Sequence, residues 1–383
     1  MTDSPQRLLA GGRVVTPDGV LTDAWVHVDG GVVASVDSHR PAVPAPVHDL
    51  EGAWLLPGLL DLHMHGGGGH DVTASRQAME AAVAFHRRHG TTATLVSLMT
   101  APVDDLCEQL RWAAQLVRRG PGPRGHVLGA HLEGPFLSPR RAGAQDPAHM
   151  LVPDRAALDR LVKAADGGLR LMTIAPELPG AVDLIEPLRR EGVIVAVGHS
   201  DAGYEEAVAA IRAGISHATH LFNAMPPLHH RAPGLVGAAL EADIPCELIS
   251  DGRHVHPALV GLVARTISCP VLVTDAIAAS GVGDGTFMLG GQEIHVHENE
   301  ARLARTGSLA GSRLTMGEAL RRAVHDSGLS IEQASAAASA NPARVLGVEA
   351  RLGSIAPGRR ADLVVLDDDL QVSAVMASGA WCE

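Results

Sequence analysis

The stretch LLPGLLDLHMHGGGG, residues 55–69, joins an apolar run to two histidines and four consecutive glycines. The apolar run predicts a buried strand, in which successive side chains point to opposite sides. His63 and His65 therefore point to one side of the strand, and Met64 points to the other. Both imidazoles lie where the apolar pattern stops, and the glycines that follow leave room close to whatever the histidines hold.

Further apolar, β-branched runs follow this strand, and amphipathic helical segments separate them. We expect these strands at residues 91–100, 125–134, 169–176, 193–200, 216–225, 244–252 and 270–276. Eight strand–helix repeats over about 250 residues predict an α/β fold, a closed (β/α)8 barrel like that of TIM. An open, doubly wound sheet is the structural alternative.

The two ends of the chain have a different pattern, with short alternating strands divided by Asp-Gly and Gly-Gly turns. Residues 1–54 and 350–383 are expected to form one small, discontinuous, β-sandwich-like domain, and residues 55–349 the barrel. A chain of 383 residues is long enough for both units.

Composition excludes several classes of protein. No apolar stretch reaches the roughly 18 residues of a membrane span, and the N-terminus lacks a secretory signal, so we expect a cytoplasmic protein. A net charge of −12 without a basic run argues against nucleic-acid binding. The four cysteines are scattered and form no CxxC pair, which predicts neither a disulfide framework nor a cysteine zinc site.

Other predicted strands also end in histidine or carboxylate side chains. Barrel enzymes assemble their active sites at the carboxyl ends of the strands, and buried carboxylates there are costly unless they are compensated. A divalent cation removes this penalty, because imidazole nitrogen and carboxylate oxygen are its ligands. The predicted site comprises His63, His65, Glu133, His199, His220 and Asp275.

The motifs PGLLDLHMHG, HLEGPF, GHSDA, HLFNAM, VTDA, LAGSRLTM, NPARVLG and GSIAPGRRADLVVLD occur in this order. Together they resemble the N-acetylglucosamine-6-phosphate deacetylase family of the amidohydrolase superfamily. The resemblance implies metal-dependent hydrolysis of the acetamide of N-acetyl-D-glucosamine 6-phosphate to glucosamine 6-phosphate and acetate. This reaction belongs to amino-sugar catabolism and cell-wall sugar recycling, and the family implies a homodimer.

The resemblance also implies residue roles, carried over by position. Glu133, His199 and His220 would bind the main metal ion, and His63 and His65 allow a second. Zn²⁺ or Fe²⁺ is expected, with Mn²⁺ or Co²⁺ as alternatives. Asp275 would be the catalytic acid and base. The implied substrate contacts are Ala144, Gln145, Asn223, Ala224, Arg231, Asp251, His254, Leu309, Ala310 and Gly311.

Two features qualify the resemblance. Gln145 stands where family members often have a histidine, and its neutral amide can form hydrogen bonds to the substrate but cannot titrate as an imidazole does. The single lysine, Lys163, lies in a predicted helix, which disfavours the relatives that bridge two metals through a carboxylated lysine. Glu133 is left as the bridging carboxylate.

Two rival functions stay open. A D-aminoacylase-like deacylase of N-acyl amino acids would share the metal residues, but it gives no reason for Arg231 and His254 together. A non-catalytic, amidohydrolase-like binding protein is the alternative from another class.

Overall fold

The central sheet contains eight parallel strands and forms a nearly closed barrel. The computed structural model describes residues 6–122, 125–298 and 300–382. A backbone bridge between Met64 and Ala276 links the first strand segment to the last. In their order around the barrel, the strands are β6 (Leu59–Asp61), β9 (Thr91–Met99), β10 (His126–Glu133), β11 (Leu169–Ile174), β12 (Ile194–Val197), β13 (His217–Ala218), β14 (Cys246–Ile249) and β15 (Pro270–Val273).

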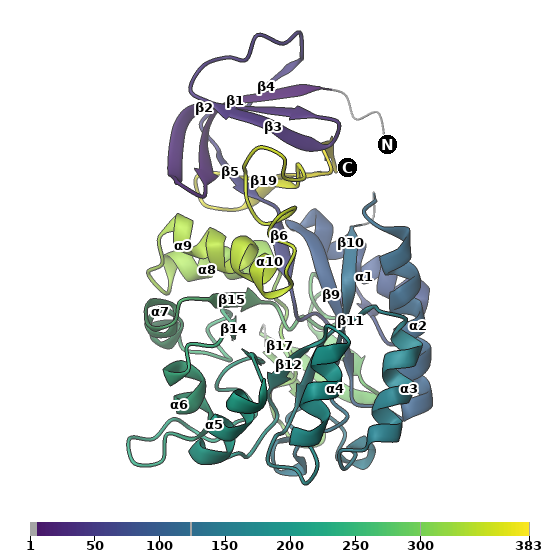
Figure 1. Ribbon diagram of the computed structural model, residues 1–383. Helices are drawn as coiled ribbons and strands as arrows, with labels where there is room; N and C mark the ends of the chain where they lie inside the picture. The colour runs from purple at the N-terminus through teal and green to yellow at the C-terminus, as the bar shows by residue number, and fades with distance from the viewer. Residues whose placement is uncertain (1–5, 123–124, 299, 383) are drawn as a thin grey trace.

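Helices alternate with these strands along the chain and lie outside the barrel (Figure 1). This arrangement confirms the predicted (β/α)8 barrel over the open-sheet alternative. The helices are α1 (Arg76–Arg88), α2 (Val103–Arg119), α3 (Arg155–Ala165), α4 (Ile185–Arg190), α5 (Tyr204–Ala213), α6 (Gly234–Glu241), α7 (Pro257–Thr266) and α8 (Met316–His325). Among the described residues, no helix combines the length and the apolarity needed to cross a bilayer.

Local sequence explains where two of these helices begin. Helix α1 begins after Ser75, whose side chain accepts a hydrogen bond from the amide of Ala78, and Asp154 caps α3 in the same way. The last turn of α1 carries His86, Arg87 and Arg88, which favour the negative end of the helix dipole. Short-range sequence signals therefore account for the starts of α1 and α3.

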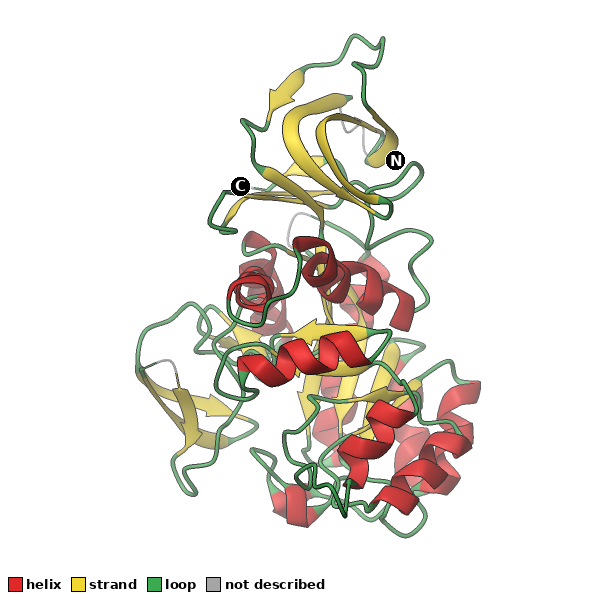
Figure 2. Ribbon diagram, turned by 90° about the vertical axis from the view of Figure 1, so that its left-hand side faces the viewer, coloured by secondary structure: helices red, strands yellow, loops and turns green. Residues whose placement is uncertain are grey.

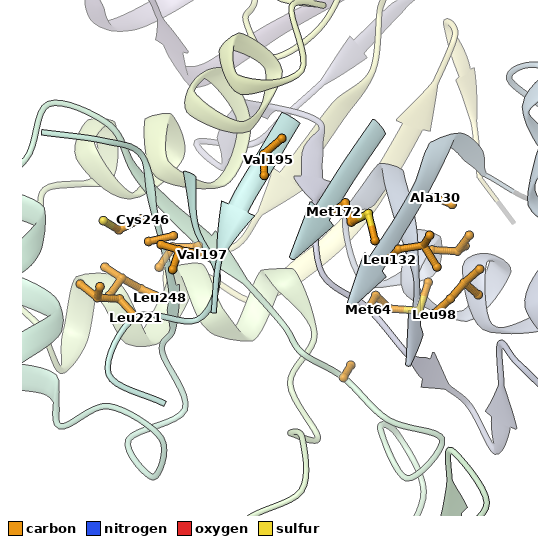
Figure 3. Close-up of a cluster of buried hydrophobic side chains, with 14 of the residues drawn as sticks. Met64, Leu98, Ala130, Leu132, Met172, Val195, Val197, Leu221, Cys246 and Leu248 are labelled. Atoms are coloured by element: carbon orange, nitrogen blue, oxygen red, sulfur yellow. The ribbon is translucent and has the colours of Figure 1, made fainter. Parts of the chain in front are cut away.

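The main hydrophobic core fills the space between strands and helices. It includes Met64, which follows β6, and the strand residues Leu98, Leu132, Val197 and Leu248, all buried (Figure 3). Met64 thus points outward into this core, opposite to its two histidine neighbours, as the alternation predicts. The barrel interior is therefore left to the residues between these positions.

Both ends of the chain contribute strands to one mixed sheet. This sheet lies at one end of the molecule, above the barrel in Figures 1 and 2. It encloses its own core, which includes Leu9, Val26 and Leu363. Its strands are β1 (Arg7–Thr16), β2 (Gly19–Asp29), β3 (Val32–Asp37), β4 (Val47–Asp49), β5 (Trp54–Pro57), β19 (Leu363–Leu366), β20 (Val372–Ala377) and β21 (Ala380–Trp381).

The first barrel strand is shorter than expected. The predicted strand began at residue 55, but residues 54–57 form β5, which pairs with β1 and β19 in the terminal sheet. Gly58 separates β5 from β6, so the chain passes directly from the terminal sheet into the barrel. The terminal sheet therefore lies beside the amino end of β6, and the carboxyl end faces away from it.

Several smaller elements complete the fold. A three-stranded antiparallel sheet, which the sequence did not predict, is inserted between β15 and α8: β16 (Gly285–Leu289), β17 (Gln292–His297) and β18 (Glu300–Leu303). Figure 2 shows it beside the barrel. A short hairpin joins β7 (Gly66–Gly67) to β8 (His70–Asp71), and α9 (Ile331–Ser335) and α10 (Asn341–Val345) flank a π-helical segment, Ala336–Ala340.

Candidate active site

Six polar side chains from distant parts of the sequence meet at the carboxyl ends of the barrel strands. Each comes from the end of its strand or from the residues that follow it, and none is more than 8% exposed. Parallel strands bring these ends to the same mouth of the barrel. The six residues that the sequence predicted for the site are thus brought together: His63, His65, Glu133, His199, His220 and Asp275.

Their donor atoms form two groups that share one carboxylate. In the first subsite (His63, His65 and Glu133), the two Nε2 atoms are 3.0 Å apart, and each is 3.4 Å from an oxygen of Glu133. In the second subsite (Glu133, His199 and His220), Oε1 of Glu133 lies 3.0 Å from His199 Nε2 and 2.9 Å from His220 Nε2. Glu133 therefore has the position of a bridging ligand.

Hydrogen bonds outside the two subsites orient three of the four imidazoles, while Nδ1 of His220 has no partner among the described residues. Nδ1 of His63 lies 3.0 Å from a carboxylate oxygen of Glu247, and Nδ1 of His65 lies 3.1 Å from the carbonyl of Ser97. Nδ1 of His199 is 2.9 Å from the carbonyl of Arg141. Because these oxygens only accept, each Nδ1 carries the proton and each Nε2 directs its lone pair into the subsite.

This donor set fits a divalent cation. Two lone pairs that face each other across 3.0 Å repel unless a positive charge lies beside them. Burial opposes a charge on both histidines. Glu133 and Glu247 nevertheless raise the pKa of His63 well above the ordinary value. Asp275 and Glu133 raise the pKa of His65 to about 9. The site therefore favours positive charge, and imidazole and carboxylate are the ligands that Zn²⁺ and Fe²⁺ accept.

The backbone is strained at the same residues. His199, His220 and Asp275 have φ angles of 46°, 27° and 49°, in the left-handed region that L-residues rarely adopt. Ala224, close after His220, has a φ of 50°. Strain of this kind persists where the surrounding structure imposes it, and it concentrates at functional sites.

Asp275 follows the last barrel strand, β15, and contacts the two histidines that follow the first strand, β6. Its Oδ1 is 3.2 Å from His65 Nε2 and 3.5 Å from His63 Nε2, and its backbone amide donates to the carbonyl of His63 over 2.8 Å. Burial would raise the pKa of Asp275, but His63 and His65 lower it below the ordinary value. Asp275 is therefore a carboxylate near neutral pH and is able to accept a proton.

A cavity of about 260 Å³ opens onto both subsites. Seven of the predicted substrate contacts line it: Ala144, Gln145, Asn223, Ala224, His254, Leu309 and Gly311. Met99 and Leu289 line it as well and form part of its apolar surface. Leu289 belongs to the inserted sheet, so this insertion contributes to the cavity.

The other three predicted contacts lie elsewhere. Arg231 is exposed, where its Nη1 is 2.9 Å from Nε2 of His230, and it does not line the cavity of its own chain. Ala310 is fully buried beside the cavity wall. Asp251 contacts His254 instead, with 2.6 Å between Oδ2 and Nδ1.

The carboxylate of Asp251 favours a positive charge on His254 at the cavity. Burial of His254 favours its neutral form, but the hydrogen bond and charge of Asp251 raise its pKa above the ordinary value. Correspondingly, His254 lowers the pKa of Asp251 despite burial. Asp251 therefore favours the protonated form of His254, which lines the cavity.

Two residues that hydrogen-bond to the predicted ligands, Glu247 and Ser97, were not predicted from the sequence. Glu247, in the run PCELIS, is completely buried and contacts His63 and His220, and Ser97 accepts from His65. A glutamate inside an apolar strand was the available signal for the first, since barrel interiors favour apolar residues. No local pattern distinguished Ser97, because its carbonyl is the group that acts.

Comparison with known proteins agrees with this geometry. The amidohydrolase family profile matches residues 54–382. The chain is 38% identical over 375 residues to the N-acetylgalactosamine-6-phosphate deacetylase of Escherichia coli O157:H7, which covers 97% of this chain and 98% of the relative. It is 36% identical over 380 residues to the N-acetylglucosamine-6-phosphate deacetylase of Bacillus subtilis, covering 96% and 94%.

Solved structures extend the likeness to three dimensions. A mutant N-acetyl-D-glucosamine-6-phosphate deacetylase from Mycobacterium smegmatis, in complex with N-acetyl-D-glucosamine-6-phosphate, has a TM-score of 0.93 at 40% identity, covering 98% of this chain and 99% of that one. The N-acetylglucosamine-6-phosphate deacetylase of Thermotoga maritima has a TM-score of 0.88 at 32% identity, with coverage of 98% and 99%. The chain therefore belongs to the amidohydrolase family, in the group of the N-acetylglucosamine-6-phosphate deacetylases.

Proposed function

We propose that this protein hydrolyses the acetamide of N-acetyl-D-glucosamine 6-phosphate to glucosamine 6-phosphate and acetate. The observation that carries the proposal is the position of Asp275, 3.2 Å from a histidine of a buried metal-donor set, at a cavity that His254 also lines. Full-length relatives that bear the deacetylase name support the same reaction.

The donor set would hold one or two divalent ions. Glu133, His199 and His220 would bind the main ion, and His63 and His65, with Glu133, a second. When bound, such an ion supplies Lewis-acid polarisation of the acetyl carbonyl and favours ionisation of the attacking water. Zn²⁺ and Fe²⁺ are the proposed metals, with Mn²⁺ or Co²⁺ as alternatives.

Asp275 moves the proton in this proposal. Its carboxylate accepts a proton from the attacking water, whose oxygen forms the new bond to the acetyl carbon. When the carbon–nitrogen bond breaks, Asp275 returns the proton to the departing amine nitrogen, so the carboxylate is regenerated. Its low pKa suits the first step, because the group must be ionised before water attacks.

Cavity residues orient the sugar. His254 provides positive charge for the phosphate, and Asn223 and Gly311 offer polar groups or close approach for the ring. Arg231 does not reach the cavity of its own chain, so its contribution to phosphate binding stays a prediction, as do the homodimer and the cytoplasmic location.

The name of one relative makes N-acetylgalactosamine 6-phosphate a second candidate substrate. The E. coli relative that is 38% identical is named for the galactosamine substrate, which differs from the glucosamine one in the configuration of one hydroxyl group. The relatives favour an amino-sugar phosphate over the N-acyl amino acid of a D-aminoacylase-like enzyme and over a non-catalytic binding role.

The proposed function is tested by incubating the purified protein with N-acetylglucosamine 6-phosphate and measuring acetate release. N-acetylgalactosamine 6-phosphate, unphosphorylated N-acetylglucosamine and an N-acetyl-D-amino acid serve as comparison substrates. We expect the glucosamine phosphate to give the highest kcat/KM, and activity to disappear on chelation and return with a defined divalent metal. Equal turnover with and without the phosphate would contradict the proposed substrate.

A further inference from the structure

Glu247 lies inside the barrel beneath the candidate site, and the proposed mechanism does not use it. It is the second residue of β14 and is completely buried. Its neighbours Cys246 and Leu248 belong to the hydrophobic cluster outside the barrel (Figure 3), so the alternation of side chains directs Glu247 inward. A buried carboxylate is costly unless N–H groups surround it, and its partners therefore indicate its role.

Three N–H groups donate to this carboxylate, and two of them belong to predicted metal ligands. Oε2 accepts from Nδ1 of His63 and from the backbone amide of His220, each over 3.0 Å. Oε1 accepts from Nε2 of His217 over 3.1 Å. Oε2 of Glu247 thus contacts the side chain of His63 in the first subsite and the backbone of His220 in the second.

Each of the two contacts acts on ligand geometry. The bond to His63 keeps the proton on Nδ1, so that Nε2 remains free to bind a metal, and an anionic acceptor makes the imidazole a stronger ligand. The bond to His220 fixes an amide whose residue has a φ of 27°, a strained conformation that needs an external partner.

We propose that Glu247 is a positioning residue that couples the two metal subsites, through one oxygen that orients His63 and holds the backbone of His220. The inference rests on the metal-dependent function proposed above, and it assigns the larger effect to the first subsite. There Glu247 contacts the ligating imidazole itself, whereas in the second subsite it contacts only the backbone.

Glu247→Gln tests the proposal with little change in shape. The amide carbonyl can still accept from His63 and His220, and its NH2 group would face His217. The ring of His217 can accept this contact by changing tautomer, because its Nδ1 has no partner among the described residues. The variant is therefore expected to fold, and to lose the negative charge that strengthens His63 as a ligand.

Metal uptake by the apoprotein is the direct measurement, and it needs no substrate. Equilibrium dialysis against Zn²⁺ with elemental analysis should give two ions per chain for the wild type. In Glu247→Gln, the affinity for one ion should fall about 10- to 100-fold, while the other ion is retained. Co²⁺ loading should show the same selective loss in the visible absorption spectrum. Glu247→Asp, which keeps the charge but withdraws the oxygens, is the second variant.

Glu80→Gln is the matched control, because it neutralises another buried glutamate at a distance from the site. Glu80 lies in α1, where its carboxylate pairs with Arg76 and Arg119 over 2.8 and 3.0 Å. This control should bind both ions with wild-type affinity. Loss of an ion in the control, wild-type uptake in both Glu247 variants, or a wild-type chain that takes up a single ion would overturn the proposal.

The two proposals fail in different ways. A wild-type chain that binds two ions but releases no acetate from the amino-sugar phosphate contradicts the proposed substrate. The dialysis of the Glu247 variants still decides the role of this residue, because metal uptake is measured without turnover.

Discussion

The side-chain amide of Gln145 donates from Nε2 to Oε2 of Glu133 over 2.5 Å, and its Oε1 accepts from the backbone amide of Thr100 over 2.8 Å. The Thr100 bond fixes which end of the amide faces Glu133. His199 and His220 contact the other oxygen, Oε1, so the glutamate is held from both sides. The sequence predicted a substrate contact at Gln145, and the structure gives this residue a second role, the orientation of the shared carboxylate.

Gln145→Leu should lower kcat/KM about 10- to 100-fold and weaken metal binding, because Glu133 loses the donor that orients it. Steady-state kinetics and elemental analysis of the dialysed protein measure the two effects. Gln109→Leu, which removes a buried amide from α2, is the control and should leave both quantities unchanged. Normal metal content combined with normal kcat/KM in Gln145→Leu would show that Glu133 needs no such partner.

Asp275→Asn should retain bound metal and lower kcat about 10²- to 10⁴-fold, because an amide cannot accept and return the proton. The amide keeps the shape of the side chain, and the backbone bonds of this residue to His63 and Ser312 do not involve it. Turnover is measured by acetate release and metal content by elemental analysis. Turnover close to the wild-type value would refute the assigned role.

Asp251→Asn should shift the pH dependence of turnover. Asp251 raises the pKa of His254, so its removal should make His254 lose its proton at a lower pH. The asparagine Oδ1 can still accept from the amides of Arg253 and His254, which preserves the turn. The alkaline limb of kcat/KM for the phosphorylated sugar should therefore move to lower pH, and KM should rise.

Unphosphorylated N-acetylglucosamine is the control substrate for this variant, since it carries no anion for His254 to bind. Its slower turnover should change little between wild type and Asp251→Asn. Superimposable pH profiles of the two proteins with the phosphorylated sugar would argue that His254 does not act as a cation.

His86 should make folding stability sensitive to acid. Burial lowers the pKa of His86 to about 4, whereas the unfolded chain has a value of about 6.5. The unfolded state therefore binds the proton more readily, and stability falls as the pH drops from about 6.5 towards 4. Between pH 7 and pH 5 this residue should account for about 2 kcal/mol of lost stability.

Chemical denaturation of His86→Gln at the two pH values measures this contribution. The glutamine amide can replace the 2.8 Å contact from Nε2 of His86 to the carbonyl of Gly66 without titrating. The variant should lose about 2 kcal/mol less than the wild type on acidification. His70→Gln, at an exposed site, should behave as the wild type does, and an unchanged acid sensitivity in His86→Gln would contradict the assignment.

The sequence predicted the parts of this protein that follow from local patterns. Strand and helix alternation gave the barrel, because burial on both sides of a parallel strand requires an apolar run between amphipathic helices. Alternation also placed His63 and His65 on one side of a strand and Met64 on the other, which the outward core position of Met64 confirms. Strand ends indicated the remaining site residues, since parallel strands end at one mouth of the barrel.

Tertiary structure alone decided how these side chains contact one another. The donation of Gln145 to Glu133, and the contacts of Glu247 with His63 and His220, join residues from different strands, and no spacing in the sequence specifies such distances. Local patterns also did not predict the inserted sheet, which places Leu289 at the cavity. The physical reason is that composition and periodicity determine which side of an element is buried, whereas hydrogen bonds to a metal ligand depend on angstrom-scale placement that only the packed barrel provides.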